Sequence, residues 1–239
     1  MSDDAELTSY DSIVIEDYLE HVERPFSWNN LYERPAVIAR LPSLKGKNVL
    51  DTGCASGFFT EYALKNGARV TAVDISKVMT ERLVARIKSV KLTIFCADIS
   101  RPMSFLKSNT YDCVICSLVL HYIKDWEPLL AELHRVLKKG GRLVISTHHP
   151  FEMYQYLKLP SYYDFKMVED TWGSSGPRPF KVHYYVRPLK EVLRPIVRSK
   201  FNIISIDEPL PTKECKELAP EVYKRLMERP GFLFIVLEK

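Results

Sequence analysis

The sequence is short of several features that would identify particular classes of protein. Its 239 residues contain no apolar run close to the roughly 20 residues that a membrane-spanning helix needs. The first six residues, MSDDAE, are acidic, whereas secretory and organelle signals are basic, so we expect a cytoplasmic protein with no membrane partner. Apolar residues make up 46% of the chain, which is enough for a hydrophobic core and argues against intrinsic disorder.

Cysteine is also scarce. The five cysteines are scattered, and an odd number suits reduced thiols better than a disulfide framework. Cys113 and Cys116 form a C-x-x-C pattern inside an apolar run that predicts a buried strand, where residues three apart point to opposite faces. The pair is therefore interpreted as structural. No cluster of histidine, cysteine and aspartate with metal-ligand spacing is visible, so no metal is expected.

Short apolar runs alternate with helical patterns through the centre of the chain. Runs rich in β-branched residues predict buried strands at residues 48–51, 69–74, 92–96, 112–116 and 142–146. Residues 58–66, 78–88 and 127–137 lie between them and have the periodicity of amphipathic helices. This alternation predicts an α/β fold with a parallel sheet and right-handed crossovers. Towards the end, strands are predicted at residues 201–206 and 232–237, and helices at residues 188–197, which Pro195 should kink or shorten, and 214–227.

Two segments fall outside this alternation. Residues 7–41 predict two helical pieces broken near Pro25, and we assign residues 1–44 to an N-terminal helical lid and residues 45–239 to the main domain. Residues 150–180 are rich in aromatic side chains and proline but show little periodicity. Such a segment inside an α/β chain is more often a lid or a substrate wall than a linker.

The chain has only nine glycines, and Gly53 and Gly57 bracket the turn between the first predicted strand and its helix. Glycines there let the backbone approach a ligand closely, beside a helix N-terminus that favours negative charge. Acidic residues end three successive strands, at Asp51, Asp74 and Asp98. Asp74 follows Gly53 by 21 residues, the position from which a carboxylate accepts both hydroxyls of a bound ribose.

Three acids at consecutive strand ends beside a glycine turn resemble the class I S-adenosylmethionine-dependent methyltransferases, of the small-molecule, methyltransferase type 11-like kind. Residues 51–57 are similar to that family's cofactor loop, 73–76 to its ribose segment, 97–99 to its adenine segment, and 111–122 and 135–146 to its fourth and fifth motifs. Ala55 departs from the pattern, because many members have glycine there. The resemblance implies a Rossmann-like, doubly wound, mostly parallel seven-stranded sheet in the order 3-2-1-4-5-7-6, with the aromatic insertion after strand 5.

The resemblance also implies the cofactor, S-adenosyl-L-methionine, and the product S-adenosyl-L-homocysteine. The carboxylate and ammonium of the cofactor would meet the Gly53 loop and Ser117, the ribose would meet Asp74, and the adenine would meet Asp98 and Ile99. The expected cofactor-binding residues are Tyr32, Asp51, Gly53, Cys54, Gly57, Asp74, Ile75, Met79, Asp98, Ile99, Ser117 and Leu118. Tyr32 would close over the methionine end, or it is an ordinary packing aromatic.

Methyl transfer from a sulfonium requires a positioned acceptor and, unless the acceptor is already a free nucleophile, removal of its proton. Histidine titrates near neutrality, and His121 and His149 follow the fourth and fifth strands. We expect His149, which Pro150 holds extended, to be the general base, with His121 as the second candidate. A pocket walled by residues 150–180 predicts methylation of an oxygen or nitrogen of a small molecule. We expect the protein to be a monomer or a homodimer.

Three alternatives stay open. The basic residues of the segment 178–200 would suit RNA methylation, although 34 Lys and Arg against 30 Asp and Glu leave a net charge of only +4, and a solvated face explains them better. Tyr154 and Lys158, with Ser146 upstream, resemble the site of a short-chain dehydrogenase, but the third glycine of that family would fall at Phe59. A binding domain without catalysis is compatible with the same cofactor residues.

Overall fold

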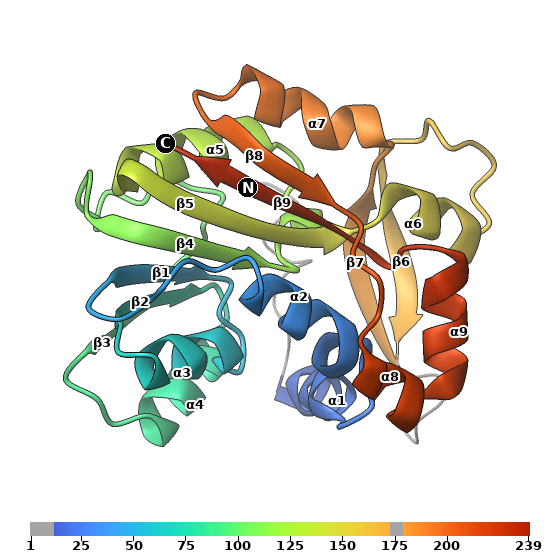
Figure 1. Cartoon of the computed structure of the whole chain (residues 1–239), viewed down its shortest axis with the longest axis horizontal. Coiled ribbons are helices and arrows are strands. Elements are labelled where there is room, and N and C mark those ends of the chain that lie inside the picture. Colours follow the sequence, from blue (N-terminus) through green and yellow to red (C-terminus); the bar gives the residue numbers. More distant parts are fainter. Residues whose placement is uncertain (1–11, 173–178) are drawn as a thin grey trace.

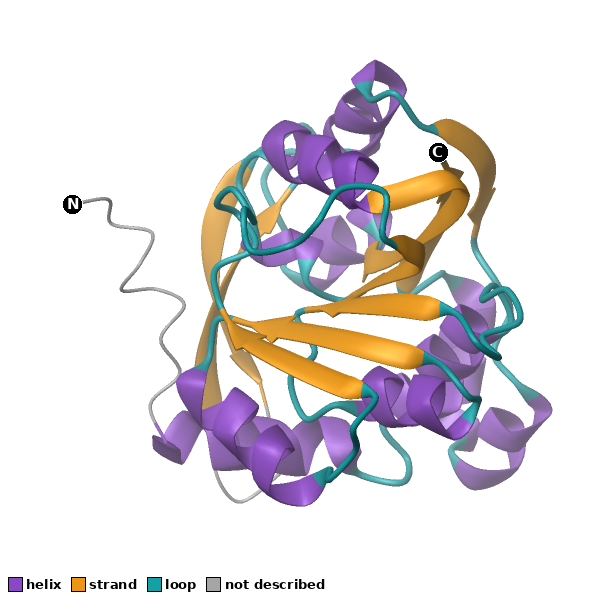
Figure 2. Cartoon of the chain, turned by 90° about the vertical axis from the view of Figure 1, so that its left-hand side faces the viewer, coloured by secondary structure: helices purple, strands orange, loops and turns teal. Residues whose placement is uncertain are grey.

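A seven-stranded sheet with helices on both faces organises the molecule (Figures 1 and 2). The computed structural model describes residues 12–172 and 179–239. In sheet order the strands are β3 (Leu92–Cys96), β2 (Arg69–Asp74), β1 (Asn48–Thr52), β4 (Tyr111–Ser117), β5 (Leu137–His148), β9 (Phe232–Glu238) and β8 (Asn202–Asp207). The order of these seven strands is the predicted one. The strand numbering differs in detail, because two further strands, β6 (Lys166–Trp172) and β7 (Phe180–Val186), form a separate antiparallel sheet.

The central strands are parallel and buried on both faces. β3, β2, β1, β4 and β5 run parallel to one another, while β9 runs antiparallel to both β5 and β8. Strands covered on both sides must be apolar throughout, which is why they appear as continuous hydrophobic runs in the sequence. Cys113 packs in the hydrophobic cluster on one face of β4 and Cys116 in the cluster on the other, as the strand periodicity predicts.

Helices cover the sheet in two layers. One face packs against α5 (Trp126–Val136) and α7 (Leu189–Arg198). The other face packs against α2 (Arg34–Ile38), α3 (Phe58–Lys65), α4 (Lys77–Arg86), α8 (Lys213–Leu218) and α9 (Pro220–Glu228). Within the described residues, no helix combines the length and the apolar composition needed to cross a membrane.

Two helix predictions near the C-terminus need correction. The helix predicted over residues 214–227 is two helices, because Pro220 starts α9 and holds Ala219 outside the α region, at φ −145° and ψ 67°. Pro195 does not shorten α7, which continues to Arg198. Pro195 and its neighbour Ile196 are buried against the sheet, so tertiary packing outweighs the lost backbone hydrogen bond.

The N-terminal segment folds as helical pieces, as predicted. α1 (Ser12–Glu23) ends before Pro25, and a single π-helical turn, η1 (Asn29–Glu33), leads directly into α2. α1 contacts β7 and α4, and an ion pair between Glu16 and Arg82 joins α1 to α4. Residues 1–11 of the expected lid lie outside the described residues.

The insertion after β5 is more regular than its sequence suggested. It contains α6 (Pro150–Tyr156) and the β6–β7 hairpin, which extends past residue 180 to Val186 and lies beyond the carboxyl ends of β4 and β5 (Figure 1). Asp170 stabilises the hairpin, because its Oδ2 accepts hydrogen bonds from Trp172 Nε1 and the Tyr184 hydroxyl, both at 2.8 Å.

Candidate functional site

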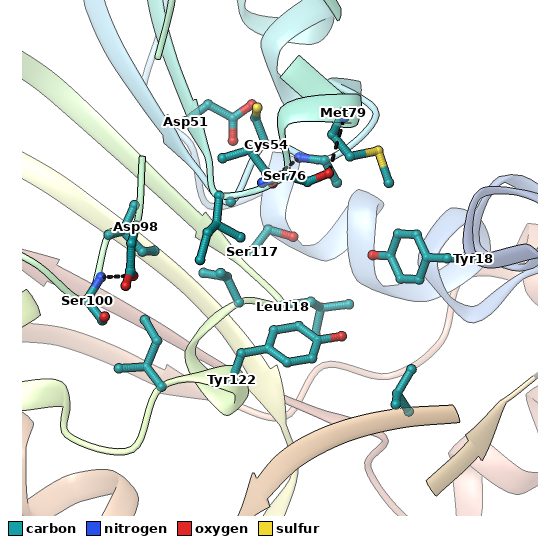
Figure 3. A pocket seen from close by; sticks show the side chains of 18 of the residues that line it. Tyr18, Asp51, Cys54, Ser76, Met79, Asp98, Ser100, Ser117, Leu118 and Tyr122 are labelled. Carbon is teal, nitrogen blue, oxygen red and sulfur yellow. Dashed lines mark hydrogen bonds between the residues drawn. The ribbon is translucent and has the colours of Figure 1, made fainter. Parts of the chain in front are cut away.

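A cavity of about 630 Å³ lies at the carboxyl ends of β1, β2 and β4, beneath α1 and the hairpin. Figure 3 shows side chains from these elements converging on it. The expected cofactor residues that line it are Asp51, Gly53, Cys54, Asp74, Ile75, Met79, Asp98, Ile99, Ser117 and Leu118. The carboxyl ends of parallel strands are the usual position of ligand sites in open α/β sheets.

The turn after β1 has the backbone that its glycines predict. Gly53 and Gly57 adopt φ angles of +67° and +85°, and a Cβ at these positions would collide with the side chains of Val119 and Leu83. Ala55 lies between them at φ +43°, which explains in physical terms why glycine suits that position. Gly57 precedes α3 and shapes the loop without itself lining the cavity.

Asp74 is held in place by the backbone. Its Oδ2 accepts a hydrogen bond from Ala55 N at 2.8 Å and its Oδ1 accepts one from Ser76 N at 2.9 Å. Burial raises the pKa of Asp74, and these two hydrogen bonds oppose the rise. The carboxylate therefore joins the glycine loop to the start of α4 and keeps acceptor capacity for hydroxyl donors, as a ribose site requires.

Asp51 is 2% exposed and accepts a hydrogen bond from Thr60 Oγ1 at 2.6 Å. Burial raises its pKa to about 7, and the negative charge of Asp74 adds to the rise. Two carboxyl groups thus share one wall, which favours a ligand carrying positive charge or hydroxyl donors.

Asp98 and Ile99 form the part of the wall expected to face the adenine, and Ile75, from the expected ribose segment, also lines the cavity. Asp98 Oδ1 accepts a hydrogen bond from Ser100 N at 2.8 Å (Figure 3). Ile99 is buried, whereas Ile75 is 43% exposed at the cavity. Apolar side chains next to a hydrogen-bonding edge suit a flat, polar base, so the residues present fit an adenosyl group.

Glu33 and Arg34 line the cavity and were not predicted from the sequence. Glu33 Oε1 accepts hydrogen bonds from Ser117 Oγ, at 2.7 Å, and from Ser146 Oγ. Their neighbour Tyr32 does not line the cavity. It is 1% exposed and stacks on Phe232, with ring centroids 5.8 Å apart. The packing interpretation of Tyr32 is the one that fits this position.

Neither of the two expected histidines lines the cavity. His149 begins α6 as its N-cap, where Nδ1 accepts a hydrogen bond from Phe151 N at 3.2 Å and Nε2 lies 2.6 Å from Glu208 Oε1. β5 extends to His148, so His149 lies just beyond the end of the strand. Both ring nitrogens of His149 are used in these structural contacts.

His121 is 2% exposed and stacks on His148, with ring centroids 3.9 Å apart. Burial lowers the pKa of His121 well below its usual value, so the ring is neutral. Neither of its ring nitrogens has a hydrogen-bond partner among the described residues. The structure places His121 in a buried aromatic cluster that does not line the cavity.

The outer wall comes from α1, which lies in the expected N-terminal lid, from the turn after β4 and from the hairpin. Tyr18 on α1 and Tyr122 on the 3₁₀ turn η2 (Leu120–Tyr122) project from different sides towards the space near Ser117 (Figure 3). Of the described residues in 150–180, only Met167 contributes, and β7 adds Lys181, Val182, His183 and Tyr185. The alternation of apolar residues over 180–186 was the available signal for this strand.

His183 is the histidine that does line the cavity within the described part of the chain. Its Nε2 lies 3.2 Å from Glu169 Oε2, and Lys181 Nζ lies 2.7 Å from the other oxygen of the same carboxylate. A carboxylate on one ring nitrogen fixes the orientation of an imidazole and leaves the other nitrogen for a ligand. The described residues include no group of three or more histidine, cysteine or acidic side chains placed to hold a metal ion.

Comparisons with known proteins agree with this geometry. A family model described as a methyltransferase domain matches residues 50–145, which span the strands that carry the acidic residues. The S-adenosylmethionine dependent methyltransferase of Mesorhizobium loti is similar in structure, with a TM-score of 0.70 and 27% identity over 87% of this chain and 97% of that one. An uncharacterized protein of Haemophilus influenzae is 26% identical over 90% of each chain.

A curated relative of named activity matches over a shorter stretch. The ubiquinone biosynthesis O-methyltransferase of Coxiella burnetii is 30% identical over 53% of this chain, and the match spans about half, 54%, of that protein. The family model covers the glycine turn and the strand-end acids and ends before α6 and the hairpin. Residues 50–145 therefore form a methyltransferase domain, and the chain shares its architecture with an S-adenosylmethionine dependent methyltransferase.

Proposed function

We propose that this methyltransferase methylates an oxygen or nitrogen of a small molecule that occupies the outer part of the cavity. The observation that carries the proposal is that one cavity joins the cofactor residues to a wall made by α1, η2 and β7. Its volume of about 630 Å³ lies within the range of about 300–1,000 Å³ usual for small-molecule sites. The named activity of the Coxiella burnetii relative, O-methyl transfer, supports a small acceptor.

Each part of the cavity has a separate task in this proposal. When bound, S-adenosyl-L-methionine supplies an electrophilic methyl group on a sulfonium. Asp74 would accept hydrogen bonds from the ribose hydroxyls, and Asp98, Ile99 and Ile75, which line the same cavity, would hold the adenine. The tyrosines Tyr18 and Tyr122, with the hairpin above them, exclude water and align the acceptor for in-line attack.

We propose His183 as the group that takes the proton from a hydroxyl or ammonium acceptor. If Nε2–H donates to Glu169, Nδ1 is the unprotonated nitrogen that can accept this proton. The carboxylate of Glu169 would then stabilise the imidazolium that forms. This role replaces the one expected of His149 and His121, because neither of them lines the cavity.

The charges of segment 178–200 support a small molecule over RNA. Ion pairs engage Lys181 with Glu169, Arg194 with Glu191, and Arg198 with Glu127. Arg187 is buried and donates a hydrogen bond to the Ile123 carbonyl. Arg178 lies outside the described residues. Phosphate binding requires lysines and arginines that are available to the backbone, and most of these cations already have partners.

The dehydrogenase alternative is not retained. Tyr154 and Lys158 do not line the cavity, and the hydroxyl of Ser146 donates to Glu33. The methyltransferase domain over residues 50–145 removes the remaining reason for this alternative.

A radiolabel screen tests the proposal. The purified chain is incubated with methyl-labelled S-adenosyl-L-methionine and either a panel of phenols, catechols, carboxylic acids and amines or total RNA. We expect label in the small-molecule fraction, and its loss in an Asp74→Asn variant. Label in RNA alone, with a steep decrease in activity as salt is raised, would contradict the small-molecule assignment.

A further inference from the structure

A second cavity lies at the opposite end of the sheet from the cofactor residues. It has a volume of about 350 Å³ and lies near the points where β1, β4 and β5 begin and β9 ends, away from the β6–β7 hairpin (Figure 1). Its wall contains four cations, Lys47, Lys138, Lys139 and Arg142. Gly140, which also lines it, has open space where a Cβ would point, so no side chain fills the hollow there.

The carboxylates in this wall neutralise only part of its charge. Asp112 lies 2.9 Å from Lys138 Nζ, and a longer contact of 3.8 Å joins Arg142 to Glu238. Lys139 has no acidic partner among the described residues. With four cations against two carboxylates, the wall keeps an excess of positive charge that an anionic ligand could neutralise.

The positive charge continues along the beginnings of β1, β2 and β3. Arg69 starts β2, Lys91 directly precedes β3, and both are exposed. Backbone hydrogen bonds of 2.8 Å place them beside Lys47, because Arg69 N donates to the Lys47 carbonyl and Val70 N donates to the Lys91 carbonyl. Within the described part of the chain, neither Arg69 nor Lys91 pairs with an acidic side chain. Since neighbouring strands lie about 4.8 Å apart, the cations from β3 to β5 extend over roughly 19 Å.

The direction of the strands thus separates the charges of the protein. Acidic side chains end β1 and β2 at the cofactor cavity, whereas cations collect where the same strands begin. We call these cations the amino-edge row: Lys47, Arg69, Lys91, Lys138, Lys139 and Arg142. Against the two carboxylates of the second cavity, the row has an excess of four charges, as large as the net charge of +4 of the whole chain.

The chemistry of this edge narrows the kind of partner that fits it. Apart from two glycines, every described residue that lines the second cavity is charged except Pro42. Val90, beside Lys91, is exposed, but one valine is a small anchor for a bilayer. Protein interfaces have apolar centres, and single-stranded nucleic acids stack on aromatic rings. The phosphates of a double helix, in contrast, can be bound by cations alone.

We propose that the amino-edge row binds the phosphate backbone of a double-helical nucleic acid without reading its sequence. Its length of roughly 19 Å corresponds to about six phosphates of one strand, at about 3.4 Å per nucleotide along the helix axis. The row lies at the far end of the strands from the cofactor cavity, so the nucleic acid is a docking partner and not the methyl acceptor. The inference goes beyond the proposed function and does not depend on it.

Binding is measured by fluorescence anisotropy with labelled duplexes of about 20 base pairs. Duplex RNA and duplex DNA, each in two unrelated sequences, are titrated with the full chain at 50 and 200 mM salt. If four phosphates are neutralised, affinity should fall about a hundredfold between these concentrations. The two sequences should bind within twofold of each other. Vesicles containing phosphatidylglycerol and poly-L-glutamate are tested as the other polyanions.

Two sets of substitutions remove the same charge from different surfaces. The test variant carries Arg69→Gln, Lys91→Gln and Lys139→Gln, the cations of the row that lack an acidic partner among the described residues. The control variant carries Lys190→Gln, Lys213→Gln and Lys224→Gln, which are exposed on α7, α8 and α9. Thermal unfolding checks that both variants fold, and both should bind S-adenosyl-L-homocysteine as the wild type does.

We expect the test variant to bind the duplexes at least tenfold more weakly at 50 mM salt. The slope of log affinity against log salt should decrease by about one for each cation removed. The control variant should change affinity less than threefold. Equal weakening by both variants, or no duplex binding by the wild type at 50 mM salt, would overturn the inference. Tighter binding of the vesicles or of poly-L-glutamate than of the duplexes would also overturn it, by assigning the row to a membrane or an acidic protein.

Discussion

The two ends of the cavity are built by different means. At the sheet edge, Asp74 is held by backbone N–H groups from Ala55 and Ser76. At the outer end, His183 is held by the side chain of Glu169, which is itself 48% exposed. A group fixed by main-chain donors keeps its position even when neighbouring side chains change, whereas one fixed by a single exposed side chain on an inserted hairpin does not. The end proposed for the cofactor is therefore preorganised by the fold, whereas the end proposed for the acceptor depends on one exposed side chain of the inserted hairpin.

Substitution of His183 should separate the two ends most clearly. With an acceptor that must lose a proton, His183→Gln should lower kcat by roughly 10²- to 10⁴-fold, the usual contribution of a general base. Its affinity for S-adenosyl-L-homocysteine should stay at the wild-type value. Steady-state kinetics combined with calorimetry measure both quantities. His149→Gln serves as the control and should keep kcat; a larger loss of kcat in this control than in His183→Gln would reverse the assignment.

Substitution of Asp74 should instead weaken the binding of the cofactor. Asp74→Ala removes the hydrogen bonds to the ribose and leaves two backbone N–H groups without their acceptor, so S-adenosyl-L-homocysteine binding should weaken by ~1–3 kcal/mol. Calorimetry at fixed salt measures the change. Unchanged affinity would remove Asp74 from the ribose site.

The cofactor end should also respond to pH through Asp51. Its folded-state pKa of about 7 lies above the usual value of 3.8, so the native state holds a proton that the unfolded chain has lost. Stability from this group is complete below about pH 4 and falls as the pH rises towards 7, by at most ~1.4 kcal/mol per pH unit.

His148 acts in the opposite direction, because desolvation lowers its pKa to about 4 and its contribution to stability is lost as the pH falls from about 6.5. The informative quantity is therefore the difference in unfolding free energy between wild type and Asp51→Asn, measured by urea denaturation from pH 4.5 to 8. This difference should shift in favour of the variant as the pH rises, and a difference that does not vary with pH would show that Asp51 titrates normally.

The smallest effect concerns the loop itself. Ala55 adopts φ +43°, which costs a residue with a Cβ about 1–2 kcal/mol, whereas glycine at this position costs more entropy on folding. Ala55→Gly should therefore leave stability unchanged or raise it by up to about 1 kcal/mol, with little change in cofactor affinity. Thermal unfolding measures the effect, and clear destabilisation would show that the methyl group of Ala55 makes contacts of its own.

The cofactor end of the cavity could be predicted from the sequence because the residues that indicate it lie within or directly after predicted strands. Asp51, Asp74 and Asp98 each follow a predicted strand, and parallel strands bring their carboxyl ends to one edge. Gly53 marks a backbone conformation that few other residues adopt. These signals carried the family resemblance, which in turn implied the strand order and the expected cofactor residues.

The rest depended on contacts that spacing does not encode. The direction of Glu33 and Arg34 follows from a π turn, and the displacement of His149 follows from how far β5 extends. β7 carried an alternating pattern, but its basic residues suggested a solvated face, and only its pairing with β6 shows that His183 reaches the cavity.

A crystal structure with S-adenosyl-L-homocysteine bound would test the central claim most directly. The account predicts the ribose hydroxyls on Asp74, the adenine beside Asp98 and the thioether facing the space between Tyr18 and Tyr122. A ligand bound elsewhere, or bound in this cavity with its ribose away from Asp74, would contradict it.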